Sequence, residues 1–109
     1  MITVTVSKDS NGVYKEVCLE GHAGYGEYGQ DIVCAAVSAL VINTVNSIEQ
    51  FTDDVAEVYD EQEETGRYGF RFASAIGKDA KLLVDSLILG LTGIQEDYGD
   101  KYMKVEISK

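Results

Sequence analysis

The chain has 109 residues, of which 45% are apolar, so it is long and apolar enough for one folded domain and is not an intrinsically disordered protein. Its net charge of −10 repels phosphate backbones, and we therefore expect no direct binding to nucleic acid. Such a surface attracts basic proteins, although an acidic surface is also common where it only keeps a protein soluble.

Neither export nor membrane insertion is expected from the sequence. It contains no run of eighteen consecutive apolar residues, and the first residues, MITVTVSKD, lack the basic and apolar regions of a signal peptide. Two cysteines in a chain without such signals favour a reducing compartment, where both remain thiols. We therefore predict a cytoplasmic protein without a membrane partner.

The start of the chain, 1–20, has the pattern of a β-hairpin. β-Branched residues at every second position predict a strand at 2–7, and the Asn-Gly pair at 11–12 predicts a tight turn before a second strand at 13–20. Carboxylates beside a thiol disfavour its thiolate form, so Cys18 in this second strand is a poor candidate for a nucleophile. The alternation places Val13, Val17 and Leu19 on one face of that strand, and Tyr14, Glu16, Cys18 and Glu20 on the other.

A first helix is predicted at 31–50. Asp31 has the side chain of a helix N-cap, which places Cys34 at the third helical position, where the positive end of the helix dipole favours a thiolate. The first three turns are apolar on nearly all sides, which predicts burial on several faces. Ser38 lies four residues after Cys34 and shares its face. Its hydroxyl either supports the site, or the small side chain only allows close packing.

The only histidine, His22, precedes this helix. It follows Gly21 at the predicted end of the second strand, and the loop 23–30, with three glycines, joins it to the helix. We expect the loop to be mobile without substrate and to close over a bound peptide, with Tyr25 or Tyr28 lining the cleft. Its candidate substrate-contacting residues are Gly24, Tyr25, Gly26, Tyr28 and Gly29.

A cysteine and a histidine that meet are the smallest set of side chains for nucleophilic acyl transfer, which makes Cys34 a candidate nucleophile and His22 its candidate base. Taken singly, such residues are more often a buried apolar thiol and a structural imidazole. One histidine and two cysteines do not supply the four ligands of a structural zinc site without carboxylates. We therefore expect neither a metal nor a cofactor.

The second half of the chain predicts two strands, a helix and a last strand. The strands are expected at 55–59 and 67–72, joined by an acidic segment at 60–66 that we interpret as solvated, and the last strand at 103–107. The second of these strands carries a row of aromatic side chains that is typical of a core: Tyr68, Phe70 and Phe72. The helix at 77–98 carries an apolar stripe: Ala80, Val84, Leu87, Leu91, Ile94 and Tyr98.

Two further features of this second helix predict contacts. Gly90 and Gly93 weaken a helix, which indicates that another element packs closely there. Leu82 and Leu89 lie outside the main stripe and suggest a contact between subunits. The element order ββαββαβ predicts a single α+β domain over residues 1–109, with both helices on one face of a mostly antiparallel sheet.

The segment 21–38, GHAGYGEYGQDIVCAAVS, resembles the ribosomal-processing cysteine protease family of bacteria. The family pattern is Gly-His-Ala, a glycine-rich spacer, then Gly, one residue, Asp-Ile-Val-Cys-Ala, and a Ser four residues after the Cys. The resemblance also covers the chain length and the order of elements. All positions of the pattern are met here: Gly21, His22, Ala23, Gly29, Asp31, Ile32, Val33, Cys34, Ala35 and Ser38.

This resemblance implies a catalytic dyad of His22 and Cys34, with Gly21, Asp31 and Ser38 in supporting positions. It also implies a homodimer. The activity implied is that of an endopeptidase that removes a short N-terminal extension from a large-subunit ribosomal protein and so supports ribosome assembly. The substrate would be the N-terminal peptide of a basic protein, which suits an acidic surface.

Two other functions are compatible with the residues. The first is a protein without catalytic activity that binds basic ribosomal proteins through its acidic surface, for which a Cys34→Ser protein would remain fully active. The second is a redox sensor that uses the Cys34 thiol, for which function would depend on oxidant without any peptide cleavage.

Overall fold

The computed structural model of the chain describes residues 1–21, 28–61 and 66–108, and for 28–31 the backbone alone. The elements follow the predicted order ββαββαβ. Their bounds are β1 Ile2–Lys8, β2 Tyr14–Glu20, α1 Tyr28–Phe51, β3 Ala56–Glu61, β4 Arg67–Phe72, α2 Lys78–Tyr98 and β5 Met103–Ser108.

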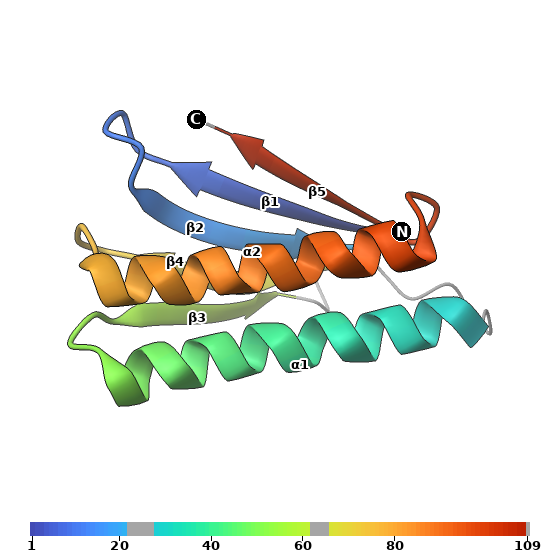
Figure 1. Cartoon of the computed structure of the whole chain (residues 1–109), viewed down its shortest axis with the longest axis horizontal. Coiled ribbons are helices and arrows are strands. Elements are labelled where there is room, and N and C mark those ends of the chain that lie inside the picture. The colour runs from blue at the N-terminus through green and yellow to red at the C-terminus, as the bar shows by residue number, and fades with distance from the viewer. Residues whose placement is uncertain (22–27, 62–65, 109) are drawn as a thin grey trace.

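Within the described residues, five strands form one sheet in the order β3-β4-β2-β1-β5. Neighbouring strands pair antiparallel except at one edge, where β5 runs parallel to β1. Both helices lie on the same face of the sheet, with α1 beside β3 and α2 beside β5 (Figure 1). The predicted α+β architecture, with a mostly antiparallel sheet and one helical layer, is confirmed.

The core lies between the sheet and the helical layer. Ile2, Val4 and Val6 point into it from β1, as their period-two spacing predicts. From β4, Phe70 and Phe72 are buried with their rings edge to face, 5.7 Å between centroids. The helices contribute Val33, Val37, Val41 and Ile48 from α1 and Ala80, Val84, Leu87 and Leu91 from α2.

The core explains one apolar row of α1, but the predicted burial of its first turns on several faces is wrong, because Ile32 and Ile42 are 36% and 59% exposed. By length and composition alone, its part Ile32–Phe51 would be able to cross a membrane, but core helices of soluble proteins meet the same test. Here α1 packs against α2 along its length and buries a row of apolar residues toward the sheet. Burial in the core therefore accounts for the apolar row of α1.

The two glycines of α2 differ in their surroundings. A Cβ atom added at Gly90 would lie 2.9 Å from Cδ1 of Leu40, so the absence of a side chain lets α1 approach there, as predicted. A Cβ atom at Gly93 would meet nothing within 4 Å. The prediction of close packing at Gly93 is wrong, because this glycine faces open space.

The alternation along β2 is interrupted by a β-bulge. Ser7 pairs with Glu16, whereas the next residue, Lys8, pairs with Tyr14, so Lys15 is the extra residue. The bulge turns Tyr14 onto the core side of the sheet, where it is 7% exposed and its hydroxyl donates a hydrogen bond to Asp85 of α2. The prediction that Tyr14 shares a face with Glu16 and Cys18 is therefore wrong, because a strict period of two does not continue across a bulge.

Replacing Tyr14 by Phe should lower the free energy of unfolding by about 1 kcal/mol at pH 7, because a hydrogen bond to a carboxylate is lost at a partly exposed site. Lys81 first, and then the Tyr14 hydroxyl, hold the pKa of Asp85 below its usual value. A lowered carboxyl pKa stabilises the fold above the unfolded-state value and loses that effect as the pH falls through the folded-state value. Urea denaturation should therefore show a smaller difference between the two proteins at pH 3 than at pH 7.

At high pH, the ionisation of Tyr14 itself removes the stabilisation. Burial first, and then Asp85, raise the pKa of Tyr14 to about 12, so its contribution is present below pH 10 and is lost as the pH rises toward 12. Tyr98→Phe is the matched control, because Tyr98 is 43% exposed at the end of α2. Equal effects of the two substitutions at pH 7 would contradict a stabilising link between Tyr14 and Asp85.

Candidate active site

The helix that carries Cys34 begins earlier than predicted. α1 starts at Tyr28 rather than Asp31, so Asp31 is the fourth residue of the helix and not its N-cap. Cys34 is consequently the seventh residue, beyond the first turn, where the influence of the helix dipole is weaker than at the predicted third position. The helical backbone already includes Gly29 and Gln30, which the prediction assigned to a loop because of their composition.

Part of the predicted site lies outside the described residues. This applies to His22 and to the loop residues Gly24, Tyr25 and Gly26. Tyr28, Gly29 and Asp31 belong to α1 by their backbone, and their side chains also lie outside the description. The meeting of His22 with Cys34 and the closure of the loop therefore stay predictions.

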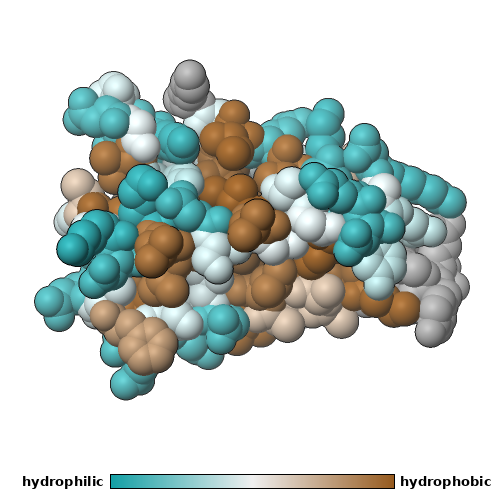
Figure 2. Space-filling view, viewed as in Figure 1, coloured by the Kyte–Doolittle hydropathy of each residue, from teal (hydrophilic) through white to brown (hydrophobic). Residues whose placement is uncertain are grey.

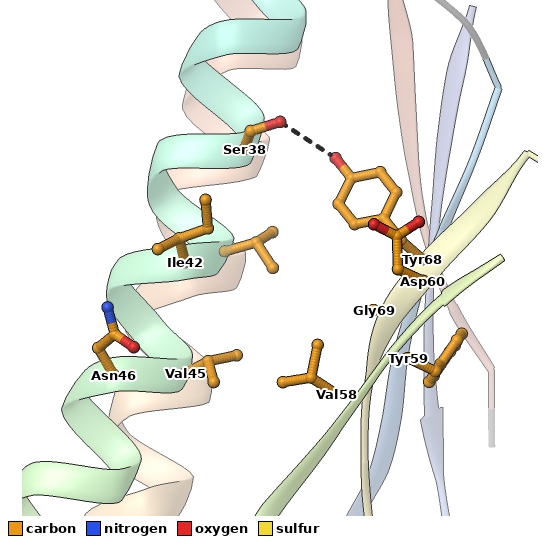
Figure 3. A pocket seen from close by; sticks show the side chains of 10 residues that line it. Ser38, Ile42, Val45, Asn46, Val58, Tyr59, Asp60, Tyr68 and Gly69 are labelled. Carbon is orange, nitrogen blue, oxygen red and sulfur yellow. Dashed lines mark hydrogen bonds between the residues drawn. The ribbon is translucent and has the colours of Figure 1, made fainter. Parts of the chain in front are cut away.

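Cys34 is half-buried on α1 and packs against the edge of the core. Ser38, one helical turn further on, shares its face, and the Ser38 hydroxyl oxygen lies 3.5 Å from the hydroxyl oxygen of Tyr68 on β4 (Figure 3). Of the two predicted roles for Ser38, a supporting hydroxyl or a small packing residue, this contact favours the supporting hydroxyl.

Tyr68 lies beside the candidate site residue Ser38, a position that the aromatic pattern concealed. The sequence groups it with Phe70 and Phe72 as core, but it is only half-buried and points its hydroxyl at α1 (Figure 3). Burial raises the pKa of Tyr68 most; the hydrogen bond with Ser38 opposes this, and the charges of Cys34 and Asp60 add to it. The signal that would have found it is chemical, since Tyr68 is the one member of the row with a hydroxyl.

A cavity of about 350 Å³ opens beside this hydroxyl pair, between α1 and the strands β3 and β4 (Figure 3). It follows the face of α1 that carries Cys34, because successive lining residues of the helix are spaced by three and four. Its polar end is formed by Ser38 and Tyr68, and its walls are largely apolar. An apolar side chain of a peptide fits this chemistry. The apolar lining residues are Val41, Ile42, Val45 and Val58.

The second thiol, Cys18, lies on the opposite face of the sheet and is 6% exposed. Its sulfur is 4.0 Å from a carboxylate oxygen of Glu20, as the strand pattern predicts, and 3.9 Å from Nη2 of Arg67. Arg67 also forms an ion pair with Glu20 at 3.3 Å. The polar cluster around Cys18 lies on the side away from the helical layer, and Arg67 and Glu20 in it are exposed. The two thiols therefore do not share a site.

Gly21 has a steric reason to be glycine. It follows the last residue of β2 with a φ of +113°, and a Cβ atom there would lie 2.0 Å from the carbonyl oxygen of Met1. Its N–H donates a hydrogen bond to the carbonyl oxygen of Gly66 at 3.3 Å. Gly21 therefore fixes the path by which the chain leaves the sheet immediately before His22.

Replacing Gly21 by Ala should lower the free energy of unfolding by about 2 kcal/mol, because the residue must adopt a left-handed conformation and the backbone of Met1 must move. Gly93→Ala is the matched control and should stabilise the protein by about 0.5–1 kcal/mol, since its Cβ atom meets nothing and a helix interior favours Ala. Thermal unfolding of both variants measures the two effects. Effects of the same sign would contradict the steric role of Gly21.

Comparison with known proteins places the chain among proteases. The ribosomal processing cysteine protease Prp of Staphylococcus aureus is 34% identical over 101 residues, which cover 92% of this chain and 93% of that protein. The Bacillus subtilis protein of the same name is 31% identical over 104 residues, with 92% of each chain covered. These relatives match nearly the whole length of both proteins.

Solved structures agree with these relatives. The crystal structure of an essential ribosomal processing protease Prp from Staphylococcus aureus, in complex with a substrate peptide, superposes with a TM-score of 0.86 at 31% identity, over 99% of this chain and 100% of that one. A Streptococcus mutans structure gives a TM-score of 0.85 at 32% identity, with 98% and 96% covered. Residues 1–104 match the protein family described as cysteine protease Prp. The chain therefore belongs to the cysteine protease Prp family.

Proposed function

We propose that this protein is a cysteine endopeptidase in which Cys34 is the nucleophile and His22 the general base, and that it removes the N-terminal extension of a large-subunit ribosomal protein. The observation that carries the proposal is the position of Cys34 on the α1 face that continues into the apolar cavity. The names of the relatives, which are ribosomal processing proteases, support the substrate class.

The reaction follows the chemistry of a thiol protease. His22 takes the proton of Cys34, and the thiolate forms a bond to the scissile carbonyl carbon. The tetrahedral intermediate collapses when the imidazolium of His22 gives its proton to the leaving amine, which leaves a thioester on Cys34. Water, deprotonated by His22, then hydrolyses this thioester and releases the second product.

The start of α1 supplies donors for the oxyanion. The N–H groups in the first turn of a helix have no partner within it, and among the described residues these belong to 28–30. Side chains of a helix lean toward its N-terminus, which directs Cys34 to that end. We assign the oxyanion to these N–H groups, a role in which a lost donor costs about 2.7–4 kcal/mol of transition-state stabilisation in other proteases.

Two features support a basic peptide with an apolar side chain near the cut. The net charge of −10 raises the rate of encounter with a basic protein, most strongly at low salt. The cavity beside Ser38 and Tyr68 takes the apolar side chain. Because the substrate is a ribosomal protein, the proposal places the enzyme in the cytoplasm.

The test is incubation with the ribosomal protein that carries its extension, followed by intact-mass measurement. The expected result is one new product that lacks the N-terminal peptide. Binding without a change in mass would favour instead a non-catalytic acidic partner of basic ribosomal proteins, for which the net charge is the supporting observation. A function that depends on oxidant, again without cleavage, would favour a redox sensor.

We also propose that the protein forms a homodimer through its helical layer. Leu82 and Leu89 of α2 are 66% and 75% exposed, and apolar surface gathers over the helices (Figure 2). Leu89→Glu should shift the protein to a monomer in light scattering at micromolar concentration, because a charge would be buried at the interface. Ile107→Glu, at an exposed apolar residue of β5, is the control that should remain dimeric.

A further inference from the structure

The hydroxyl pair of Ser38 and Tyr68 lies at the junction of two features. On one side is Cys34, one helical turn before Ser38 on the same face of α1. On the other is the polar end of the cavity, where the two hydroxyl oxygens are 3.5 Å apart (Figure 3). A peptide bound at Cys34 with a side chain in the cavity passes this pair.

Tyr68 is held in place from several directions. Its backbone is paired on both sides, with Leu19 of β2 and Asp60 of β3. Its ring packs against the core, so the hydroxyl has little freedom to turn away from α1. A donor fixed in this way needs no reorganisation when charge develops nearby.

We propose that Tyr68 is a positioning residue of the active site: its hydroxyl donates to the Ser38 oxygen and so leaves the Ser38 proton directed at Cys34, where the pair favours the thiolate. This inference rests on the proposed role of Cys34 as the nucleophile. A hydroxyl that donates toward a thiolate stabilises the charged form of the cysteine. Asp60 opposes this effect, because its carboxylate faces the same site from β3.

The phenol stays a neutral donor under working conditions. Burial first, and then the charges of Cys34 and Asp60, raise the pKa of Tyr68, and the Ser38 hydrogen bond does not cancel this. Tyr68 therefore keeps its proton near neutral pH. Among the described residues, the charged or titratable groups that face it are Cys34 from α1 and Asp60 from β3.

The experiment is the pH dependence of Cys34 alkylation by iodoacetamide, measured by peptide mass spectrometry in the wild type, Tyr68→Phe and Ser38→Ala. We expect alkylation of either variant at pH 7 to be about threefold to tenfold slower, because less of the thiol is ionised. At high pH, where the thiol is fully ionised, the rates should converge on the wild-type plateau. A change that only alters access to Cys34 would instead shift the rate at every pH.

Two further measurements test whether the hydroxyls of Ser38 and Tyr68 act together or independently. If the hydroxyls act together, the double variant should be slowed no more than the slower single variant, whereas independent effects multiply. Tyr98→Phe and Ser47→Ala remove a hydroxyl elsewhere, from α2 and from another part of α1, and should match the wild type. Thermal unfolding confirms that each variant is folded, and Ser38→Ala keeps the test decisive if Tyr68→Phe is unstable.

An unchanged alkylation profile in folded Tyr68→Phe and Ser38→Ala would overturn the inference, as would multiplicative effects in the double variant. Alkylation requires no substrate, so this result is independent of cleavage. If the wild type fails to cut the ribosomal protein while the profile shifts as expected, the proposed cleavage fails and the effect of Tyr68 on the Cys34 thiolate stands. If cutting occurs and the profile is unchanged, the reverse holds.

Discussion

Purified Cys34→Ala protein should leave the ribosomal substrate entirely uncut while it keeps its fold. Cys34 is only half-buried, at the edge of the core, so removing its sulfur leaves the packing of Val33 and Val37 intact. The second thiol cannot replace Cys34 as the nucleophile, since Cys18 lies on the far face of the sheet. The substrate and the variant are incubated together and intact masses are measured over time, with thermal unfolding to confirm the fold.

Two companion variants sharpen this expectation. Cys34→Ser should be nearly inactive, because a hydroxyl is much harder to deprotonate than a thiol. Cys18→Ser should cut at close to the wild-type rate, because its contacts with Arg67 and Glu20 belong to a separate cluster. Cleavage by the Cys34→Ala protein at the wild-type rate would show that the nucleophile is another group.

His22→Ala should reduce kcat/KM about a hundredfold or more, the usual scale for a lost general acid and base. His22 is the only imidazole in the chain, so no second group titrates near neutral pH in the same way. Cleavage rates across pH 5–9 measure the effect. The wild type should lose activity as the pH falls and the imidazole becomes protonated.

Alkylation provides the control for this variant. Iodoacetamide should modify Cys34 faster than Cys18 near neutral pH, since Cys18 is 6% exposed and Cys34 is half-buried. The preference should shrink in His22→Ala, because the base that ionises Cys34 is gone. A variant that retains both the full cleavage rate and the full preference would remove His22 from the mechanism.

Most of the fold could be predicted from the sequence because its signals are periodic. The alternation in β1 and the apolar stripe of α2 each correspond to buried faces in the structure. One error arose where local backbone geometry breaks the period. The extra residue Lys15 turns Tyr14 into the core, and no alternation rule contains that information.

In the candidate site, the placement of Ser38 relative to Cys34 could be predicted from the sequence, and the surroundings of these two residues could not. Cys34 and Ser38 share a face because of helical spacing alone, so the sequence was sufficient. Tyr68 comes from a strand thirty residues away, and its approach to Ser38 depends on how α1 packs over β3 and β4. The sequence places the start of α1 too late, because an Asp after glycines can lie inside the first turn of a helix as well as at its N-cap.

The parallel pairing of β5 with β1 determines when the sheet can be completed during synthesis. Ile2 lies beside Met103, so a contact of the innermost core joins the first and the last of the five strands. During synthesis β1 and β2 emerge first, but the outer side of β1 keeps unpaired N–H and C=O groups until β5 leaves the ribosome. The sheet is therefore completed only once β5 has emerged. A chain released before β5 would expose an unprotected strand edge, which is a template for aggregation.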